Sequence, residues 1–109
     1  MKHLVKRDLK SLGLTCCYCG WKPAIYAILL VVRDESRLQN VMTDIYQPTA
    51  DALHLHPYNV ERNIRTLVQR AWQVDKQRLA CLAGYKLDAP PSASQFIEII
   101  ASHVRDLSS

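Results

Sequence analysis

Residues 45–72 read IYQPTADALHLHPYNVERNIRTLVQRAW, and this segment decides the fold. Its spacing predicts two helices, from Pro48 to Leu53 and from Pro57 to about Gln73, separated by a turn at residues 54–56. A proline is tolerated in the first helical turn because its missing N–H would have no partner there. Two helices joined by so short a turn are typical of a helix-turn-helix, which is a DNA-binding motif.

The second of these helices has two chemically different sides when residues advance by about 100° each. One stripe is apolar and consists of Val60, Ile64, Leu67, Val68 and Ala71. The opposite stripe is polar and consists of Tyr58, Glu61, Arg62, Arg65 and Gln69. We expect the apolar stripe to pack inside the protein and the polar stripe to project into solvent.

The polar stripe contains side chains that suit the reading of base edges in a major groove. Arg62 and Arg65 can each present a two-pronged donor to a guanine. Glu61 is costly near phosphates unless it accepts from a cytosine amino group or orients a neighbouring arginine. The alternative is an ordinary solvated helix face, on which Glu61 and Arg65 form an i,i+4 ion pair.

Contacts to the DNA backbone, or at the edge of the same surface, would come from polar neighbours of the reading residues. The candidates are Thr49 with the amides at the start of its helix, His56, Tyr58, Asn59, Thr66, Gln69 and Arg70. Each of them, taken singly, is explained better as an ordinary exposed polar residue.

The composition indicates one globular domain covering residues 1–109, with 49% hydrophobic residues to build a core. A formal net charge of +4 and a pI near 9.0 favour polyanionic partners without specifying one. The longest apolar run, residues 24–32, is far shorter than the roughly 20 residues of a membrane span. With no secretory signal either, we expect a cytoplasmic protein without membrane contact.

The chain has four cysteines, Cys16, Cys17, Cys19 and Cys81. Cys16 and Cys19 form a C-x-x-C pair that could bind zinc if the fold brought His54 and His56 to it. Capping of helix ends explains the histidines more simply, and burial as small apolar side chains explains the cysteines. No phosphate-binding loop, serine nucleophile motif or carboxylate pair is visible, so we expect neither a cofactor nor an enzyme.

Helical spacing and helix-ending residues account for the rest of the chain. The expected helices cover residues 2–12, 20–33, 38–45, 75–84 and 92–104, with residues 20–33 the most buried. Asp75 can cap the helix that ends at Gly84, and Ser92 with Gln95 forms a capping box. No segment alternates with a period of two, so the fold class is an all-α bundle of about six helices with no sheet.

Several short pieces, in order along the chain, resemble a known family. They are Gly13, Gly20-Trp21, Ile45-Tyr46, Val60-Glu61-Arg62, Ile64-Arg65, Ala71-Trp72, Gly84-Tyr85 and residues 91–97 (PSASQFI). The chain resembles the DNA-binding effector domain of the sporulation master regulator, stage zero sporulation protein A, over nearly its whole length. The resemblance implies a helical, winged-helix-like domain of the response-regulator effector type, built round a helix-turn-helix.

The resemblance also implies roles and partners. The family binds short double-stranded DNA boxes, commonly as tandem copies, and the residues matching Glu61, Arg62 and Arg65 contact bases. Residues 75–85 would contact an RNA polymerase sigma factor, and the last helix would pair two domains in a homodimer.

The chain departs from the family at three points. Asn59 and Asp51 stand where the family has basic residues, which puts the target sequence in doubt. The family protein carries a phosphorylatable receiver domain ahead of the effector, whereas here we expect a stand-alone chain without one rather than a fragment. A competing interpretation is therefore a receiver-less interaction module that pairs with a full-length regulator or a sigma factor and modulates it.

Overall fold

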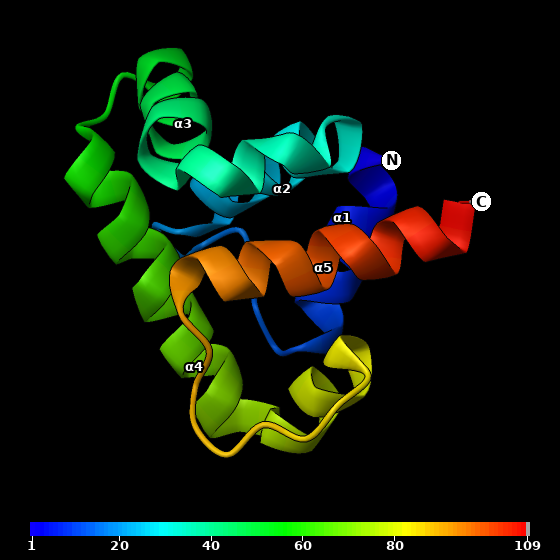
Figure 1. Cartoon of the computed structure of the whole chain (residues 1–109). Coiled ribbons are helices and arrows are strands. Elements are labelled where there is room, and N and C mark those ends of the chain that lie inside the picture. The colour runs from blue at the N-terminus through cyan, green and yellow to red at the C-terminus, as the bar shows by residue number, and fades with distance from the viewer. Residues whose placement is uncertain (109) are drawn as a thin grey trace.

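The computed structural model describes residues 1–108. Its elements are α1 (Lys2–Ser11), α2 (Trp21–Arg33), the 3₁₀ helix η1 (Glu35–Asn40), the π-helical turn η2 (Met42–Tyr46), α3 (Gln47–Leu53), α4 (Pro57–Ala83) and α5 (Ala93–Ser108). All regular structure among these residues is helical, as the sequence predicted (Figure 1). None of these helices, within residues 1–108, combines the length and the apolar character that a membrane span requires.

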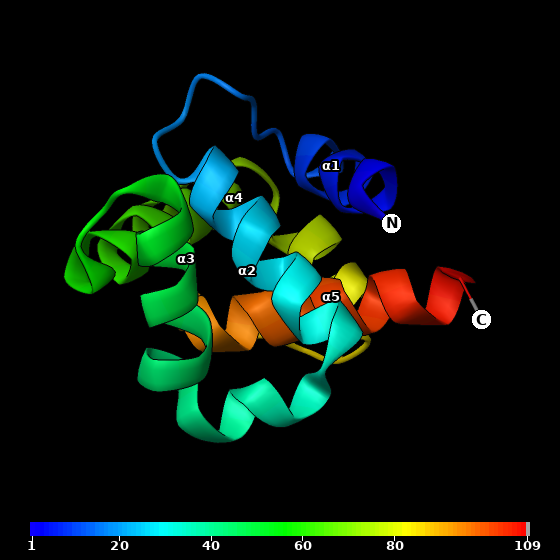
Figure 2. The ribbon, with the colours of Figure 1, turned by 90° about the horizontal axis from the view of Figure 1, so that it is seen from above.

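Helix α2 is the centre of the fold. It packs against every other element, and Figure 2 shows it between α1, α3 and α5. Ala24, Ala27 and Ile28 on this helix have no exposed surface, and Phe96 and Ile100 of α5 are equally buried. A helix that is apolar nearly all round can be satisfied only in such a position, so the expectation that residues 20–33 are the most enclosed is confirmed.

The predicted helix boundary at Asp75 is present as a kink inside α4. Asp75 leaves the helical region (φ −159°, ψ 80°), and its Oδ1 accepts a hydrogen bond from the Arg78 amide at 3.0 Å. It therefore caps residues 76–83, as expected. Gly84 ends that segment with a φ of 80°, a left-handed conformation that glycine adopts without a steric penalty.

The capping box predicted at the start of the last helix is half formed. The Ser92 hydroxyl accepts from the Gln95 amide at 3.1 Å, as that motif requires. The Gln95 side chain, however, donates to the Tyr85 hydroxyl at 3.1 Å rather than returning to Ser92. This bond links the start of α5 to the connection that follows α4.

Residues 35–53 differ from the prediction. An α-helix over 38–45 and a separate helix starting at Pro48 were expected, but η1 and η2 run directly into α3 without a break. Inside a helix, a proline ring conflicts with the carbonyl four residues earlier, which here belongs to Asp44. That carbonyl instead accepts from the Arg37 guanidinium at 2.6 Å. The π-helical turn and this side-chain bond together let the chain pass through Pro48 while remaining helical.

Candidate nucleic-acid interface

The first part of α4, residues 57–74, is anchored by its apolar stripe. The five predicted residues Val60, Ile64, Leu67, Val68 and Ala71 are each between 0 and 2% exposed. They face α2, α3, α5 and η2, which all pack against this helix. The direction in which the opposite stripe points is therefore set by the core.

The polar stripe projects from the protein. Tyr58 is 71% exposed, and Arg62, Arg65 and Gln69 are also exposed. The side chain of Arg65 retains 52% of its accessible surface and that of Glu61 retains 31%. The expected division of the helix into a buried and an outward flank is confirmed.

Two contacts along the helix hold the arginines. Arg65 Nη1 lies 3.6 Å from Glu61 Oε1, and Arg62 Nη2 donates to Asn59 Oδ1 at 3.2 Å. Exposed pairs of this kind contribute little to stability, because water competes for both partners. These contacts orient the guanidinium groups, and each arginine can exchange its present acceptor for another one at a small cost in free energy. The ion pair anticipated for a solvated face is thus present, and it is compatible with base reading.

Glu61 lies at the boundary between the outward flank and the core. Burial raises the pKa of the neighbouring Tyr46 to about 12, and the negative charge of Glu61 adds to that increase. The phenol is therefore uncharged at neutral pH.

The turn before α4 is held by the capping of both helices that it joins. His54 has a φ of 57° and ends α3, while His56 Nδ1 accepts from the Tyr58 amide at 3.2 Å. The His56 ring also stacks on the Tyr58 ring, with centroids 5.0 Å apart. An Nδ1 that accepts a bond leaves the Nε2–H group of His56 free to donate outward.

Thr49 was predicted to contact phosphate, and this prediction is wrong for its side chain. The residue has no exposed surface, and its hydroxyl donates to the Ile45 carbonyl at 2.7 Å. The amides at the start of its helix are not free either, because η2 continues directly into α3 and the Gln47 amide bonds to the Met42 carbonyl. Thr49 and these amides are unavailable to phosphate because the backbone before Pro48 is continuously helical.

The other edge candidates lie at the surface. Asn59 is partly exposed, and Thr66, Gln69 and Arg70 are exposed. The Thr66 hydroxyl donates to the Arg62 carbonyl at 3.0 Å, so it would have to rotate before it could donate to a phosphate. Arg70 is exposed and places a cation at this edge of the helix.

The alternative zinc site is not assembled. Residues 1–108 contain no group of three or more His, Cys, Asp or Glu side chains placed to hold a metal ion, so Cys16 and Cys19 do not meet His54 and His56. The interpretation of the cysteines as buried apolar residues is also wrong, because all four are exposed free thiols. Their position depends on tertiary packing that helical periodicity does not report.

The connection between α1 and α2 lies directly against the reading helix, a contact that the spacing of residues in the sequence did not indicate. A Cβ at Gly20 would be only 2.4 Å from the Asn63 carbonyl oxygen, so only glycine allows this approach. Beside the contact is a hollow of about 530 Å³. It is lined by Cys17, Tyr18, Cys19, Gly20, Asn63, Thr66, Leu67 and Arg70. The Gly20-Trp21 pair was the only signal of this close approach.

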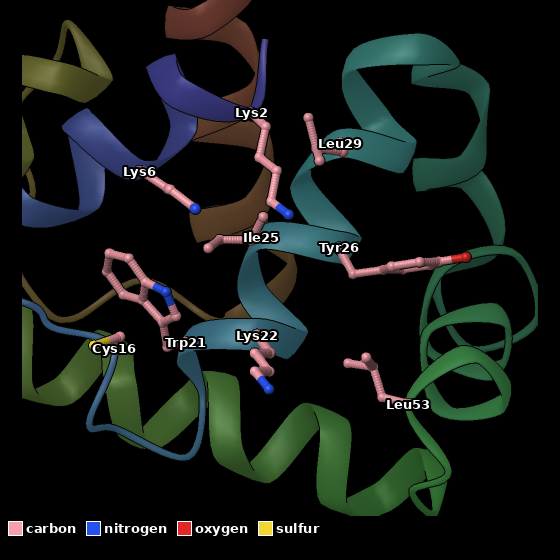
Figure 3. A pocket seen from close by; sticks show the side chains of 9 residues that line it. All are labelled: Lys2, Lys6, Cys16, Trp21, Lys22, Ile25, Tyr26, Leu29 and Leu53. Atoms are coloured by element: carbon pink, nitrogen blue, oxygen red, sulfur yellow. The ribbon is translucent and has the colours of Figure 1, made fainter.

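A second hollow lies between α1 and α2. It has a volume of about 310 Å³, and Figure 3 shows Lys2, Lys6 and Lys22 around an apolar floor. Cys16 lies there beside Trp21, away from the hollow that Cys17 and Cys19 line. The three neighbouring cysteines thus line two different hollows.

A comparison with known families agrees with this geometry. The family model described as sporulation initiation factor Spo0A C terminal matches residues 5–104, nearly the whole chain. That family is a DNA-binding regulatory domain and not an enzyme family. The resemblance inferred from the ordered short motifs is confirmed. The chain therefore belongs to the family of Spo0A C-terminal domains, the DNA-binding part of a sporulation regulator.

Proposed function

We propose that this protein is a sequence-specific DNA-binding transcription regulator that inserts residues 57–74 of α4 into the major groove. One observation carries the proposal: Arg62 and Arg65 project into solvent from a helix whose opposite flank is fully buried. The major groove admits an α-helix, and such a helix must be both rigidly held and uncovered on its reading side. Helix α3, the turn and α4 would then act as the helix-turn-helix.

The proposed base contacts follow from the chemistry of the outward flank. Arg62 and Arg65 would each donate to O6 and N7 of a guanine, and Glu61 would accept from a cytosine amino group. On binding, the Arg65–Glu61 and Arg62–Asn59 contacts would exchange for contacts to bases. Since both contacts are exposed, this exchange costs little.

The backbone contacts that we propose flank the base contacts. Arg70 supplies a charge at one edge, and His56 Nε2–H and the Tyr58 hydroxyl supply donors at the start of the helix. Asn59 and Gln69 lie between them and can reach either a base edge or a sugar. Contacts to phosphate would position the helix and make the affinity dependent on salt.

Two further partners are proposed on the strength of the family. Two copies would bind tandem DNA boxes as a homodimer through α5, and residues 75–85 would contact a sigma factor of RNA polymerase. The kink at Asp75 supports the second of these, because it turns residues 76–83 away from the axis of the reading helix (Figure 1). A bound DNA duplex would then leave that segment uncovered.

Selection of bound duplexes from a random pool tests the main proposal. The expected result is one enriched box, which then resists a large excess of random duplex in a mobility-shift titration at fixed salt. Enrichment of no sequence would contradict specific reading. Absence of any retained DNA, together with capture of a purified full-length regulator or sigma factor, would identify the protein as an interaction module instead.

A further inference from the structure

Three exposed thiols lie in the connection between α1 and α2, and two of them border the reading helix. Cys17 and Cys19 line the hollow of about 530 Å³ together with Asn63, Thr66 and Arg70 of α4. Cys16 instead lines the hollow of about 310 Å³ together with residues of α1 and α2 (Figure 3). Cys16 and the pair Cys17 and Cys19 therefore belong to different hollows, and all three are free thiols.

The connection is held in place by its own hydrogen bonds. The Tyr18 amide donates to the Thr15 carbonyl at 3.2 Å, and the Trp21 amide donates to the Tyr18 carbonyl at 3.0 Å. At its end, Gly20 fits against the Asn63 carbonyl with no room for a side chain. An adduct on Cys17 or Cys19 would therefore lie beside α4.

We propose that Cys17 and Cys19 are a modification site for small thiols that carry carboxylates, and that an adduct there weakens DNA binding. A cysteine thiolate would attack a low-molecular-weight disulfide such as oxidised glutathione. One new S–S bond forms, the original S–S bond breaks, and the released thiolate takes up a proton. The attacking cysteine is oxidised to the mixed disulfide, and one half of the small disulfide is reduced.

The effect on DNA follows from where the adduct would be, and it rests on the proposed function. Arg70 and Thr66 border both the hollow and the flank that we assign to backbone contacts. Glutathione has two carboxylates and one ammonium group, so its adduct adds net negative charge next to Arg70. It would occupy the hollow, neutralise the favourable cation and repel the phosphates.

The location of Cys16 argues against a disulfide between the C-x-x-C partners Cys16 and Cys19. These two residues line different hollows. For an adduct on Cys19, the thiol that reverses it would therefore come from solution and not from Cys16. Cys81 is also an exposed free thiol, but it lies in the segment of α4 beyond the Asp75 kink. It provides a matched control.

Four variants that each keep one cysteine, with the other three changed to serine, test the proposal. Each is treated with oxidised glutathione, the single adduct is verified by intact mass, and DNA affinity is measured before and after reduction. The box selected by the unmodified protein is the probe. For the variants keeping Cys17 or Cys19 we expect the adduct to weaken binding at least about tenfold, with full recovery on reduction. For the variant keeping Cys81 we expect a change below about twofold.

A second disulfide separates charge from bulk. The disulfide of glutathione diethyl ester leaves an adduct of nearly the same size whose two carboxylates are masked and whose amine stays charged, and at Cys17 or Cys19 it should preserve affinity to within about threefold. An equal loss with both adducts would overturn the electrostatic basis of the proposal.

Other outcomes would overturn the proposal itself. These are an unchanged affinity with an adduct at Cys17 or Cys19, an equal loss with an adduct at Cys81, or wild-type protein that forms an internal disulfide and no adduct. Reduced protein that binds no specific duplex would instead contradict the proposed function. The two failures are therefore distinguishable.

Discussion

The two flanks of residues 57–74 differ in almost every physical respect although they share one helix. The inner flank, represented by Ile64, has no exposed surface and is surrounded by four other elements. The outer flank, represented by Arg62 and Arg65, makes only short-range contacts with neighbours on its own helix. Stability and recognition are thus carried by different side chains, and a substitution on one flank should leave the property of the other unchanged.

The largest expected effect is a loss of stability after a substitution on the inner flank. Ile64→Ala should lower the free energy of unfolding by about 2–5 kcal/mol, because it removes buried apolar surface and leaves a cavity. Urea denaturation followed by circular dichroism measures it. Gln69→Ala is the control, because Gln69 lies on the same helix but is exposed. It should change the free energy of unfolding by less than about 0.5 kcal/mol. Equal losses in both variants would contradict the division into flanks.

The next effect concerns the contact that holds the connection against the reading helix. Gly20→Ala should destabilise the protein by about 1–3 kcal/mol, because its Cβ would overlap the Asn63 carbonyl oxygen and force α2 and α4 apart. Thermal denaturation measures it.

Gly84→Asn is the control for that prediction, since a Cβ at Gly84 meets no atom within 4 Å and asparagine tolerates a positive φ. Its cost should be clearly smaller. A Gly20→Ala protein as stable as the wild type would mean that the connection does not depend on this close approach.

The stability of the protein should fall at alkaline pH because of Tyr46, which lies at the boundary between the two flanks. Because the pKa of Tyr46 is raised to about 12, the folded state holds the phenol proton more tightly than the unfolded state does. The resulting stability is fully present below the ordinary value near 10 and is lost as the pH rises through about 12. In paired melts from pH 9 upward, wild-type protein should lose more stability than Tyr46→Phe. Parallel curves would show that Tyr46 is not the group responsible.

The smallest expected effect is on the outer flank. Glu61→Gln removes the ion pair with Arg65 and should cost only a few tenths of a kcal/mol in urea denaturation. It also removes a negative charge near the proposed phosphate positions, so affinity for random duplex should increase while preference for the selected box decreases. If the preference increases, Glu61 opposes specific reading instead of contributing to it.

The predictable parts of the molecule are those that local rules control. Residues 57–74 follow a strict apolar period, and Asp75 and Gly84 are caps whose chemistry is local, so the sequence predicted them correctly. Residues 35–53 do not follow such rules, because the path through Pro48 depends on a bond from Arg37 to the Asp44 carbonyl. The spacing of apolar residues gives no indication of that bond.

The surface was harder to predict than the core. Thr49 is buried because the helix before it is continuous, and the thiols of Cys17 and Cys19 lie beside α4 because of the contact between Gly20 and Asn63. Both facts follow from how separate segments pack, which a single sequence does not encode in any spacing. The outward position of Arg62 and Arg65 was predictable, since it is the geometric complement of a buried stripe.

The most direct test of the central claim is a binding titration of Arg62→Ala/Arg65→Ala against the selected box and a random duplex at one salt concentration. We predict that each arginine contributes about 1–3 kcal/mol to the preference for the box, so the double variant should bind both duplexes almost equally. Its urea denaturation midpoint should match that of the wild type, because both side chains are exposed. Undiminished preference for the box in a folded double variant would contradict the assignment of this flank as the reading surface.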